Sequence, residues 1–263
     1  MLHQIIEIHY YERSMKKIIF TIFLSVLFVS IPSFANSQKA QKKSQPTYPW
    51  TILSLDAKFN KDEANFLRYA KNNSNVKTSP VAVFMGDSIT DGWARQNPDF
   101  FKKNNYIGRG ISGQVSSQML VRFRRDVIDL KPKFVLILAG TNDIARNKGY
   151  ISEENIAGNI ISMCEIAKIN GVEPIICSIL PAAKYKWRPE IKSVEPIKKV
   201  NAILKKYADA NSIAYLDYYS VLDDGNSGLS KAHSGDGVHP TKACYAIMEK
   251  MAKALIDKRS ESK

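Results

Sequence analysis

Three short motifs carry the side chains best suited to chemistry in this chain. The first is Gly86-Asp87-Ser88-Ile89-Thr90, which directly follows a short apolar run at residues 81–85. A serine on a tight turn between a strand and a helix exposes its Oγ and can offer its own N–H to an oxyanion. Taken alone, the motif also fits a serine that caps a helix. Ser88 is therefore a candidate nucleophile that needs a base.

The second motif, Gly140-Thr141-Asn142-Asp143, follows the apolar run at residues 134–139. An asparagine amide can donate to a developing negative charge without changing its own protonation state. A plain β-turn also favours Asn and Asp, so this motif is a candidate only in company with others.

The third motif, Asp236-Gly237-Val238-His239-Pro240, precedes a helical pattern near the end of the chain. A spacing of three residues on a turn lets the carboxylate reach one ring nitrogen of His239 and leaves the other as a general base. Two of the four histidines fall in a predicted leader segment, and His233 has no carboxylate at this spacing. We therefore expect Ser88, His239 and Asp236 to act together.

Together the three motifs resemble the SGNH/GDSL hydrolases, over about residues 80–254. That family has a fourth signature, a glycine in the loop after the second strand, and residues 109–114 occupy this place. The resemblance implies an oxyanion hole made by the N–H groups of Ser88 and Gly113 and the side-chain amide of Asn142. Gly110 is a rival for the glycine role, because the loop is rich in glycine.

The resemblance implies acyl transfer by a serine ester hydrolase. His239 would take the proton of Ser88 as the hydroxyl attacks an ester carbonyl, and Asp236 would orient His239 and stabilise its charged form. This chemistry requires neither a metal nor an organic cofactor, and the expected partner is a small-molecule or glycan ester.

The elements that must position these motifs can be read from the alternation of apolar runs and helical patterns. Short apolar runs at 81–85, 134–139, 174–179 and 213–216 predict strands buried on both faces, and 106–107 suggests another. Helical patterns cover 115–130, 153–170, 190–211 and 241–256. The alternation predicts an α/β domain, a three-layer doubly wound parallel sheet of about five strands. The resemblance implies the flavodoxin-like form of this architecture.

A rival motif overlaps the glycine loop. Residues 108–113 read Gly-x-Gly-x-x-Gly, the fingerprint of a dinucleotide site. It follows the second strand rather than the first, and the acidic residues about 20 positions on, Asp126 and Asp129, lie within a helical pattern. An esterase is therefore the favoured interpretation.

The start of the chain predicts export. A basic pair after Met15, an apolar run at 18–31 and a small-residue site ending at Ala35 are typical of a signal peptide, with residues 1–14 upstream of the true start. We expect a signal peptide at 1–35, a polar tether at 36–49 and the hydrolase domain at 50–263. The expected location is the periplasm or the cell exterior, without stable membrane insertion once the signal is removed.

Bulk composition excludes some classes of protein. The net charge is +13, but the lysines are scattered and no nucleic-acid motif accompanies them, so we expect no nucleic-acid partner. Cys164, Cys177 and Cys244 match no zinc or redox spacing and lie in apolar stretches, which favours buried free thiols. The oligomeric state stays open.

Substrate recognition is expected from the loop at residues 181–189. Tyr185, Trp187 and Arg188 in this loop could stack on a sugar and hydrogen-bond to it, and Asp87 and Trp93 near the nucleophile are further candidates. We expect short acyl groups, mainly acetyl, on a carbohydrate. The alternatives are a lysophospholipase or thioesterase of the same family, and a non-catalytic glycan-binding protein on the same fold.

Overall fold

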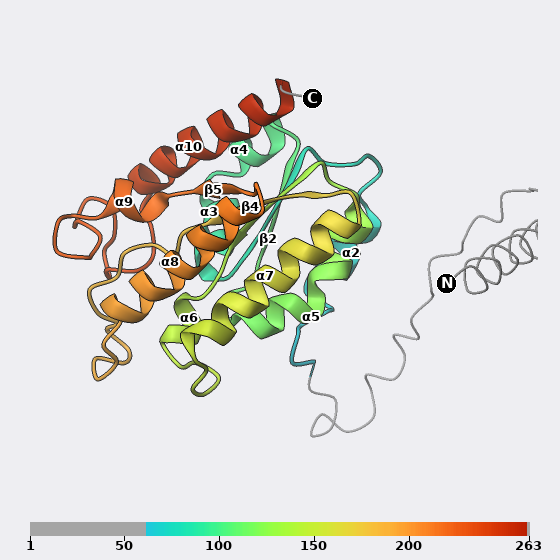
Figure 1. Ribbon diagram of the computed structural model, residues 1–263. Helices are drawn as coiled ribbons and strands as arrows, with labels where there is room; N and C mark the ends of the chain where they lie inside the picture. The colour runs from blue at the N-terminus through green and yellow to red at the C-terminus, as the bar shows by residue number, and fades with distance from the viewer. Residues whose placement is uncertain (1–61, 262–263) are drawn as a thin grey trace, which may run out of the picture. The chain divides into compact units, whose positions relative to one another are not determined.

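Five parallel strands form the centre of the structure (Figure 1). The computed structural model describes residues 62–261; the predicted signal peptide, the tether and the first residues of the expected domain lie outside them. The sheet has the order β2-β1-β3-β4-β5, with every neighbouring pair parallel. Its strands are β1 (Ala82–Gly86), β2 (Tyr106–Gly110), β3 (Phe134–Leu138), β4 (Glu173–Cys177) and β5 (Ala214–Leu216). The predicted doubly wound sheet is confirmed.

This strand order places a functional crevice. The chain runs from β1 outward to β2, returns to β3 on the other side of β1, and then continues outward through β4 and β5. The direction of winding therefore reverses between β1 and β3, and ligands of such folds bind at the carboxyl ends of the strands beside this reversal. The residues that follow β1, β2 and β3 must consequently meet at one edge.

Helices cover both faces of the sheet because alternate strand residues point in opposite directions. In β3, Val135 and Ile137 pack into one apolar core, whereas Phe134, Leu136 and Leu138 pack into the other. The first core is closed by α5 (Ser116–Asp126), α7 (Glu153–Ile169) and α8 (Val194–Ala210). The second is closed by α3 (Ser88–Gln96), α4 (Pro98–Lys103), α9 (Tyr218–Leu222) and α10 (Lys242–Glu261). The described residues also contain three short helical elements: α2 (Ala70–Ser74), η3 (Ile128–Leu130) and α6 (Thr141–Ile144).

Three helix boundaries differ from the predicted ranges. The pattern at 115–130 breaks into α5 and η3, and the turn stops at Lys131, whose φ of 53° is left-handed before Pro132. The helix predicted to start at 190 begins at Val194. The last helix continues to Glu261, one turn beyond the last apolar position at Ile256. This final turn is polar, so no apolar spacing marks it, and Arg259 within it pairs with Glu173 of β4.

All three cysteines are buried and unbridged, as predicted. Burial raises the pKa of the Cys164 thiol to about 12, so the thiol stays protonated at neutral pH. In the part of the chain that the structure describes, no helix is both long and apolar enough to cross a membrane.

A buried guanidinium connects the end of β1 to α5. Arg122 is fully buried, and it donates to the carbonyl of Gly86 at 3.0 Å, to Oε1 of Gln114 at 2.6 Å and to Oδ2 of Asp126 at 2.9 Å. One side chain thus fixes the strand end that precedes Ser88 and the loop that contains Gly113. Breaking such a network from one side leaves a buried charge unpaired, which is strongly destabilising.

Close packing of β2 on α3 predicts opposite effects for two Gly→Ala substitutions. A Cβ at Gly110 would lie 2.1 Å from the backbone nitrogen of Asp91 and 2.6 Å from the carbonyl oxygen of Asp87, whereas a Cβ at Gly158 in α7 meets nothing within 4 Å. Gly110→Ala should lower the free energy of unfolding by about 3 kcal/mol or more. Gly158→Ala should raise it by about 0.5–1 kcal/mol. Urea unfolding of both variants measures this, and equal effects would contradict the backbone contact.

Candidate active site

The turn between β1 and α3 presents Ser88. Asp87 is the N-cap of α3, and its Oδ1 accepts a hydrogen bond from the Ile89 N–H at 2.9 Å. Ser88 is therefore the first residue of the helix, where backbone N–H groups have no partner within the helix. Gly86 permits the sharp turn, because a Cβ there would lie 2.1 Å from Oγ1 of Thr90 and 2.9 Å from the carbonyl oxygen of Leu138.

His239 lies beside Ser88 although the two are 151 residues apart in the sequence. The Oγ of Ser88 is 2.9 Å from Nε2 of His239, and Nδ1 of His239 is 2.6 Å from Oδ2 of Asp236. His233 donates its backbone N–H to the Ser230 carbonyl, and among residues 62–261 its ring has no comparable contact with a hydroxyl and a carboxylate. The structure thus brings together the hydroxyl, imidazole and carboxylate that the motifs singled out.

The second carboxylate oxygen of Asp236 is held by its own turn. Oδ1 accepts the N–H groups of Val238 at 2.9 Å and His239 at 2.8 Å, and the hydroxyl of Ser234 lies at 3.1 Å. Partial burial opposes ionisation of Asp236, but hydrogen bonds from the His239 ring and from the two backbone N–H groups hold its pKa well below the usual range. The carboxylate is ionised at neutral pH, so it favours the His239 tautomer with hydrogen on Nδ1 and a free lone pair on Nε2.

The two glycines that compete for the oxyanion role differ in their surroundings. Gly113 has a φ of +81°, open space around its Cα, and an N–H that donates to no acceptor within residues 62–261. Gly110 belongs to the edge strand β2, and its carbonyl accepts a hydrogen bond from the Tyr69 hydroxyl. In a strand, the N–H and C=O of one residue point to the same side, so the Gly110 N–H faces the outer edge. This geometry favours Gly113.

The glycine fingerprint at residues 108–113 serves packing. A Cβ at Gly108 would lie 2.6 Å from Cβ of Ala94, and one at Gly110 would meet the backbone of the first turn of α3. Both glycines therefore face α3 at close distance and leave no room for a pyrophosphate between them. The dinucleotide interpretation is not supported.

The Asn142 amide lies buried at the carboxyl edge of β3. Its Nδ2 donates to the Gln114 carbonyl at 3.0 Å and has a longer contact of 3.4 Å with Oδ2 of Asp87. Its Oδ1 accepts a hydrogen bond of 2.7 Å from Nδ2 of Asn147. The amide is thus oriented by neighbours on both sides, and one N–H is only weakly engaged.

Asp87 holds the Ser88 turn through the Ile89 N–H and does not face solvent, so the prediction that it contacts substrate is wrong. Its side chain is buried between the Ile89 N–H and the Asn142 amide. Burial raises the pKa of Asp87 from 3.8 to about 6, although the Ile89 hydrogen bond and the proximity of His239 oppose the shift.

Two aromatic candidates belong to the core, which corrects the expectation that they contact substrate. Trp93 is 1% exposed, packs against Phe84 and Tyr245, and donates its indole N–H to Glu249. Tyr185 is fully buried, so its ring cannot offer a face to a sugar. Trp93 follows the Ser88 turn and Tyr185 lies in the loop after β4, but aromatic rings in a domain of this size are mostly buried.

Trp187 does lie at the site. It is 43% exposed, packs against Tyr185 with 5.1 Å between ring centroids and a tilt of 35°, and lies with its centroid 6.4 Å from that of His239. Lys186 connects the same loop to the turn at residues 234–240, which contains His239 and is called the base-bearing turn here, because its Nζ donates to the Gly235 carbonyl at 3.1 Å. Arg188 is half-buried further along, with its N–H on the Tyr185 carbonyl.

Sequence reasoning missed three residues that hold the site together. Asp143 is buried and accepts the N–H and hydroxyl of Ser116, which fixes the start of α5 beside the glycine loop. Ser234 donates to the base-bearing turn, and Asn147 donates to Asn142. The position of Asp143 within the second motif was a signal. The other two are polar residues in loops and carried none.

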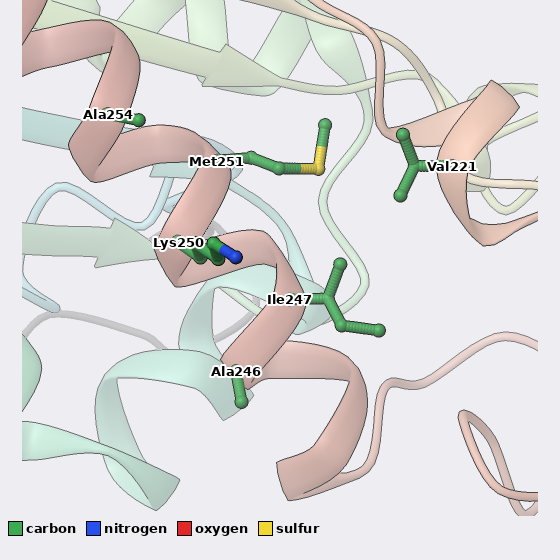
Figure 2. Close-up of a pocket in the computed structure, with 6 residues that line it drawn as sticks. All are labelled: Val221, Ala246, Ile247, Lys250, Met251 and Ala254. Atoms are coloured by element: carbon green, nitrogen blue, oxygen red, sulfur yellow. The ribbon is translucent and has the colours of Figure 1, made fainter.

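Two cavities of different character lie among the described residues, and neither is lined by Ser88, Asp236 or His239. An apolar groove of about 590 Å³ lies between α9 and α10, lined by Val221, Ala246, Ile247, Lys250, Met251 and Ala254, and shares no residue with the site (Figure 2). A second hollow of about 340 Å³ borders the turn after Asn142. Its charged lining is Asp143, Arg146, Glu153, Glu190 and Lys192.

Comparisons with known proteins agree with this architecture. The profile of the GDSL-like lipase/acylhydrolase family matches residues 84–247. A provisionally assigned acylhydrolase from Bacteroides fragilis NCTC 9343 is 48% identical in its solved structure, with a TM-score of 0.73, covering 76% of this chain and 99% of its own.

Two further proteins match less completely. The uncharacterized lipoprotein YqeF of Bacillus subtilis (strain 168) is 33% identical over 116 residues, which are 38% of this chain and 48% of the lipoprotein. The match therefore spans about half the length of that curated relative. An acetylxylan esterase from Geobacillus stearothermophilus shares the fold at 18% identity, with a TM-score of 0.56, over 69% of this chain and 95% of the esterase.

The raised pKa of Asp87 predicts a pH-dependent effect of Asp87→Asn on stability. Because the folded-state pKa is about 6 and the ordinary value is 3.8, the wild type loses stability as the pH rises through this window. The variant keeps an oxygen for the Ile89 N–H and cannot ionise. Its free energy of unfolding relative to wild type should rise between these pH values and level off above them, by on the order of 2–3 kcal/mol.

Urea unfolding from pH 4 to pH 8 measures this difference. Asp99→Asn, in the exposed first turn of α4, is the control for loss of a carboxylate that is not buried. A difference that stays constant with pH for Asp87→Asn would mean that Asp87 titrates alike in the folded and unfolded states.

Proposed function

The chain belongs to the GDSL-like lipase/acylhydrolase family and is a serine ester hydrolase, and from that premise we propose that it is an exported esterase that removes short acyl groups, mainly acetyl, from carbohydrates. The observation that carries the catalytic part is the continuous row from the Ser88 hydroxyl through His239 to Asp236, with contacts of 2.9 Å and 2.6 Å.

In the proposed mechanism, Nε2 of His239 takes the Ser88 proton as Oγ bonds to the ester carbonyl carbon. The carbonyl π electrons move to its oxygen, and Asp236 stabilises the imidazolium that results. Collapse of the tetrahedral intermediate expels the alcohol, which receives the proton from His239. Water then attacks the acyl-serine, again with His239 as base, and releases the acid.

The oxyanion would be held by three donors that belong to three strand ends. They are the N–H of Ser88 after β1, the N–H of Gly113 after β2 and the side-chain amide of Asn142 after β3. Donors that are already oriented stabilise the developing charge without reorganisation during the reaction. Gly113 is assigned here in preference to Gly110, because the Gly110 N–H faces the outer edge of β2, away from β1, whereas the Gly113 N–H has no acceptor within residues 62–261.

The surroundings of Ser88 support a small acyl group on a polar alcohol. Trp187 offers an exposed ring beside His239, and aromatic rings of this kind stack on sugars. The hollow bordered by Asp143 is lined by charged side chains and by apolar ones such as Ile144 and Ile156. The larger apolar groove lies elsewhere, between α9 and α10, and shares no residue with the site. The acetylxylan esterase with the same fold makes an acetylated glycan a reasonable first substrate.

Export is supported by the predicted signal peptide at residues 1–35 and by the similarity to a lipoprotein. The proposed destination is the periplasm or the cell exterior, where an esterase would meet extracytoplasmic glycans.

Hydrolysis of a p-nitrophenyl ester series, from acetate to decanoate, tests the proposal. The purified protein should be fastest on acetate and should release acetate from an acetylated xylo-oligosaccharide. Ser88→Ala should be inactive on every ester and should no longer react with a fluorophosphonate probe. Faster cleavage of octanoate or decanoate esters would contradict the acetyl preference and would indicate that the substrates are lipids or thioesters. A wild type that neither hydrolyses esters nor reacts with the probe would favour a glycan-binding protein.

Asp236→Asn should abolish most of the activity while leaving the fold intact. The remaining oxygen can still accept the N–H groups of Val238 and His239, but the new amide would donate to Nδ1 of His239. Hydrogen would then move to Nε2, which could no longer accept the Ser88 proton. We expect kcat for p-nitrophenyl acetate to fall by on the order of 10³–10⁴ with an unchanged thermal midpoint. A decrease of less than tenfold would exclude this role.

A further inference from the structure

We propose that Asn147 is a positioning residue that fixes the Asn142 amide for oxyanion binding and couples it to the indole of Trp187. The proposal rests on the proposed function, because it assumes that Asn142 donates to the oxyanion. Nothing in the motif pattern points to Asn147, which is a half-buried loop residue five positions after Asn142.

The turn after α6 directs Asn147 back onto Asn142. Arg146 adopts a left-handed conformation with a φ of 54°, and the Asn147 N–H then donates to the Asn142 carbonyl at 3.0 Å. The side chain makes a second contact with the same residue, from its Nδ2 to Oδ1 of Asn142 at 2.7 Å. Asn147 therefore holds both the backbone and the side chain of the proposed oxyanion donor.

Asn142 and Asn147 form a chain of hydrogen bonds whose two end groups are Gln114 and Trp187. Each end group can act only as an acceptor or only as a donor, so the end groups set the direction of every hydrogen bond between them. The Gln114 backbone carbonyl can only accept, so the Asn142 amide must present Nδ2 to it. The Trp187 indole N–H can only donate, and it points at Oδ1 of Asn147 at 3.4 Å. The row therefore runs from Trp187 through Asn147 and Asn142 to Gln114.

This arrangement has a consequence for catalysis. One N–H of Asn142 is used by Gln114, and the other has only the 3.4 Å contact with Asp87, so it is the one available to an oxyanion. Hydrogen bonds in a row polarise one another, so donation from Asn147 makes the remaining Asn142 N–H a stronger donor. Trp187 belongs to the loop at residues 181–189 and lies beside His239. The chain of hydrogen bonds therefore also links this loop to the proposed oxyanion hole.

Two substitutions of Asn147 distinguish orientation from packing. Asn147→Ala removes the donor to Asn142, and kcat for p-nitrophenyl acetate should fall roughly tenfold. Asn147→Asp has nearly the same shape and still accepts from Trp187, but it cannot donate to Asn142 and favours a flipped Asn142 amide. Its kcat should fall by on the order of 10²-fold, the cost of one lost oxyanion donor. In both variants KM should change less than twofold, since the interaction acts in the transition state.

Lys148→Asp is the matched control for the added charge. It places a carboxylate on the neighbouring exposed residue, whose only described ion pair is an exposed one with Glu63 at 3.4 Å. Its kcat should stay within about twofold of wild type. A merely structural role for Asn147 would make the near-isosteric Asp variant milder than the Ala variant, so that order would overturn the proposal.

A double-mutant cycle tests the link to Trp187. Trp187→Phe keeps an aromatic ring beside His239 but lacks the indole N–H. It should lower kcat about twofold to threefold in the wild type, because the contact is long, and should have no further effect in Asn147→Ala. Additive effects would exclude the coupling.

These outcomes differ from a failure of the proposed function. A wild type without esterase activity or fluorophosphonate labelling would remove the esterase and this inference together. An active wild type whose Asn147 variants keep the wild-type kcat would remove only the role of Asn147.

Discussion

The site depends on a backbone contact between the first turn of α3 and the ends of β1 and β2. At Gly86 and Gly110 a single Cβ would come within 2.1 Å of another atom, and at Gly108 within 2.6 Å. Without side chains at these positions, the strands reach the helix closely enough for Ser88 to begin the helix directly at the carboxyl edge of the sheet. A residue of ordinary size would displace α3, and Ser88 would move away from His239.

The polar groups around this contact form a continuous buried network. Arg122 bonds to the Gly86 carbonyl, to Gln114 and to Asp126, and Asp143 holds the start of α5 through Ser116. Burying these charges is costly, and each is compensated only because its partners are already in place. The result is a set of strand ends whose relative positions cannot change independently. That property suits a site whose donors must be oriented before the reaction begins.

The features that could be predicted from the sequence are those that depend on residues close together in the chain. Continuous apolar runs indicated the strands, and the spacing of three residues between Asp236 and His239 indicated their pairing, because both depend on neighbours in sequence. The roles of Trp93 and Tyr185 could not be predicted in this way. Their residue types suit both a sugar platform and an aromatic core, and only the tertiary packing decides between them. Asn147 was missed for a related reason, since its contacts with Asn142 and Trp187 arise from the tertiary arrangement and no local sequence pattern marks them.

The nucleophile and the base are held by different physical means. The environment of Ser88 is set by packed helices, strands and buried charges, whereas His239 and Asp236 are 44% and 42% exposed at their side chains. Their turn is stabilised by hydrogen bonds within residues 234–240, with three donors directed at one carboxylate oxygen, and it is anchored by Val238, which is buried in the first core. Exposed segments open at lower free energy than the core. The Ser88–His239 contact would therefore be lost by a local movement of the exposed His239 and Asp236 side chains, while Val238 and the oxyanion donors would remain in place.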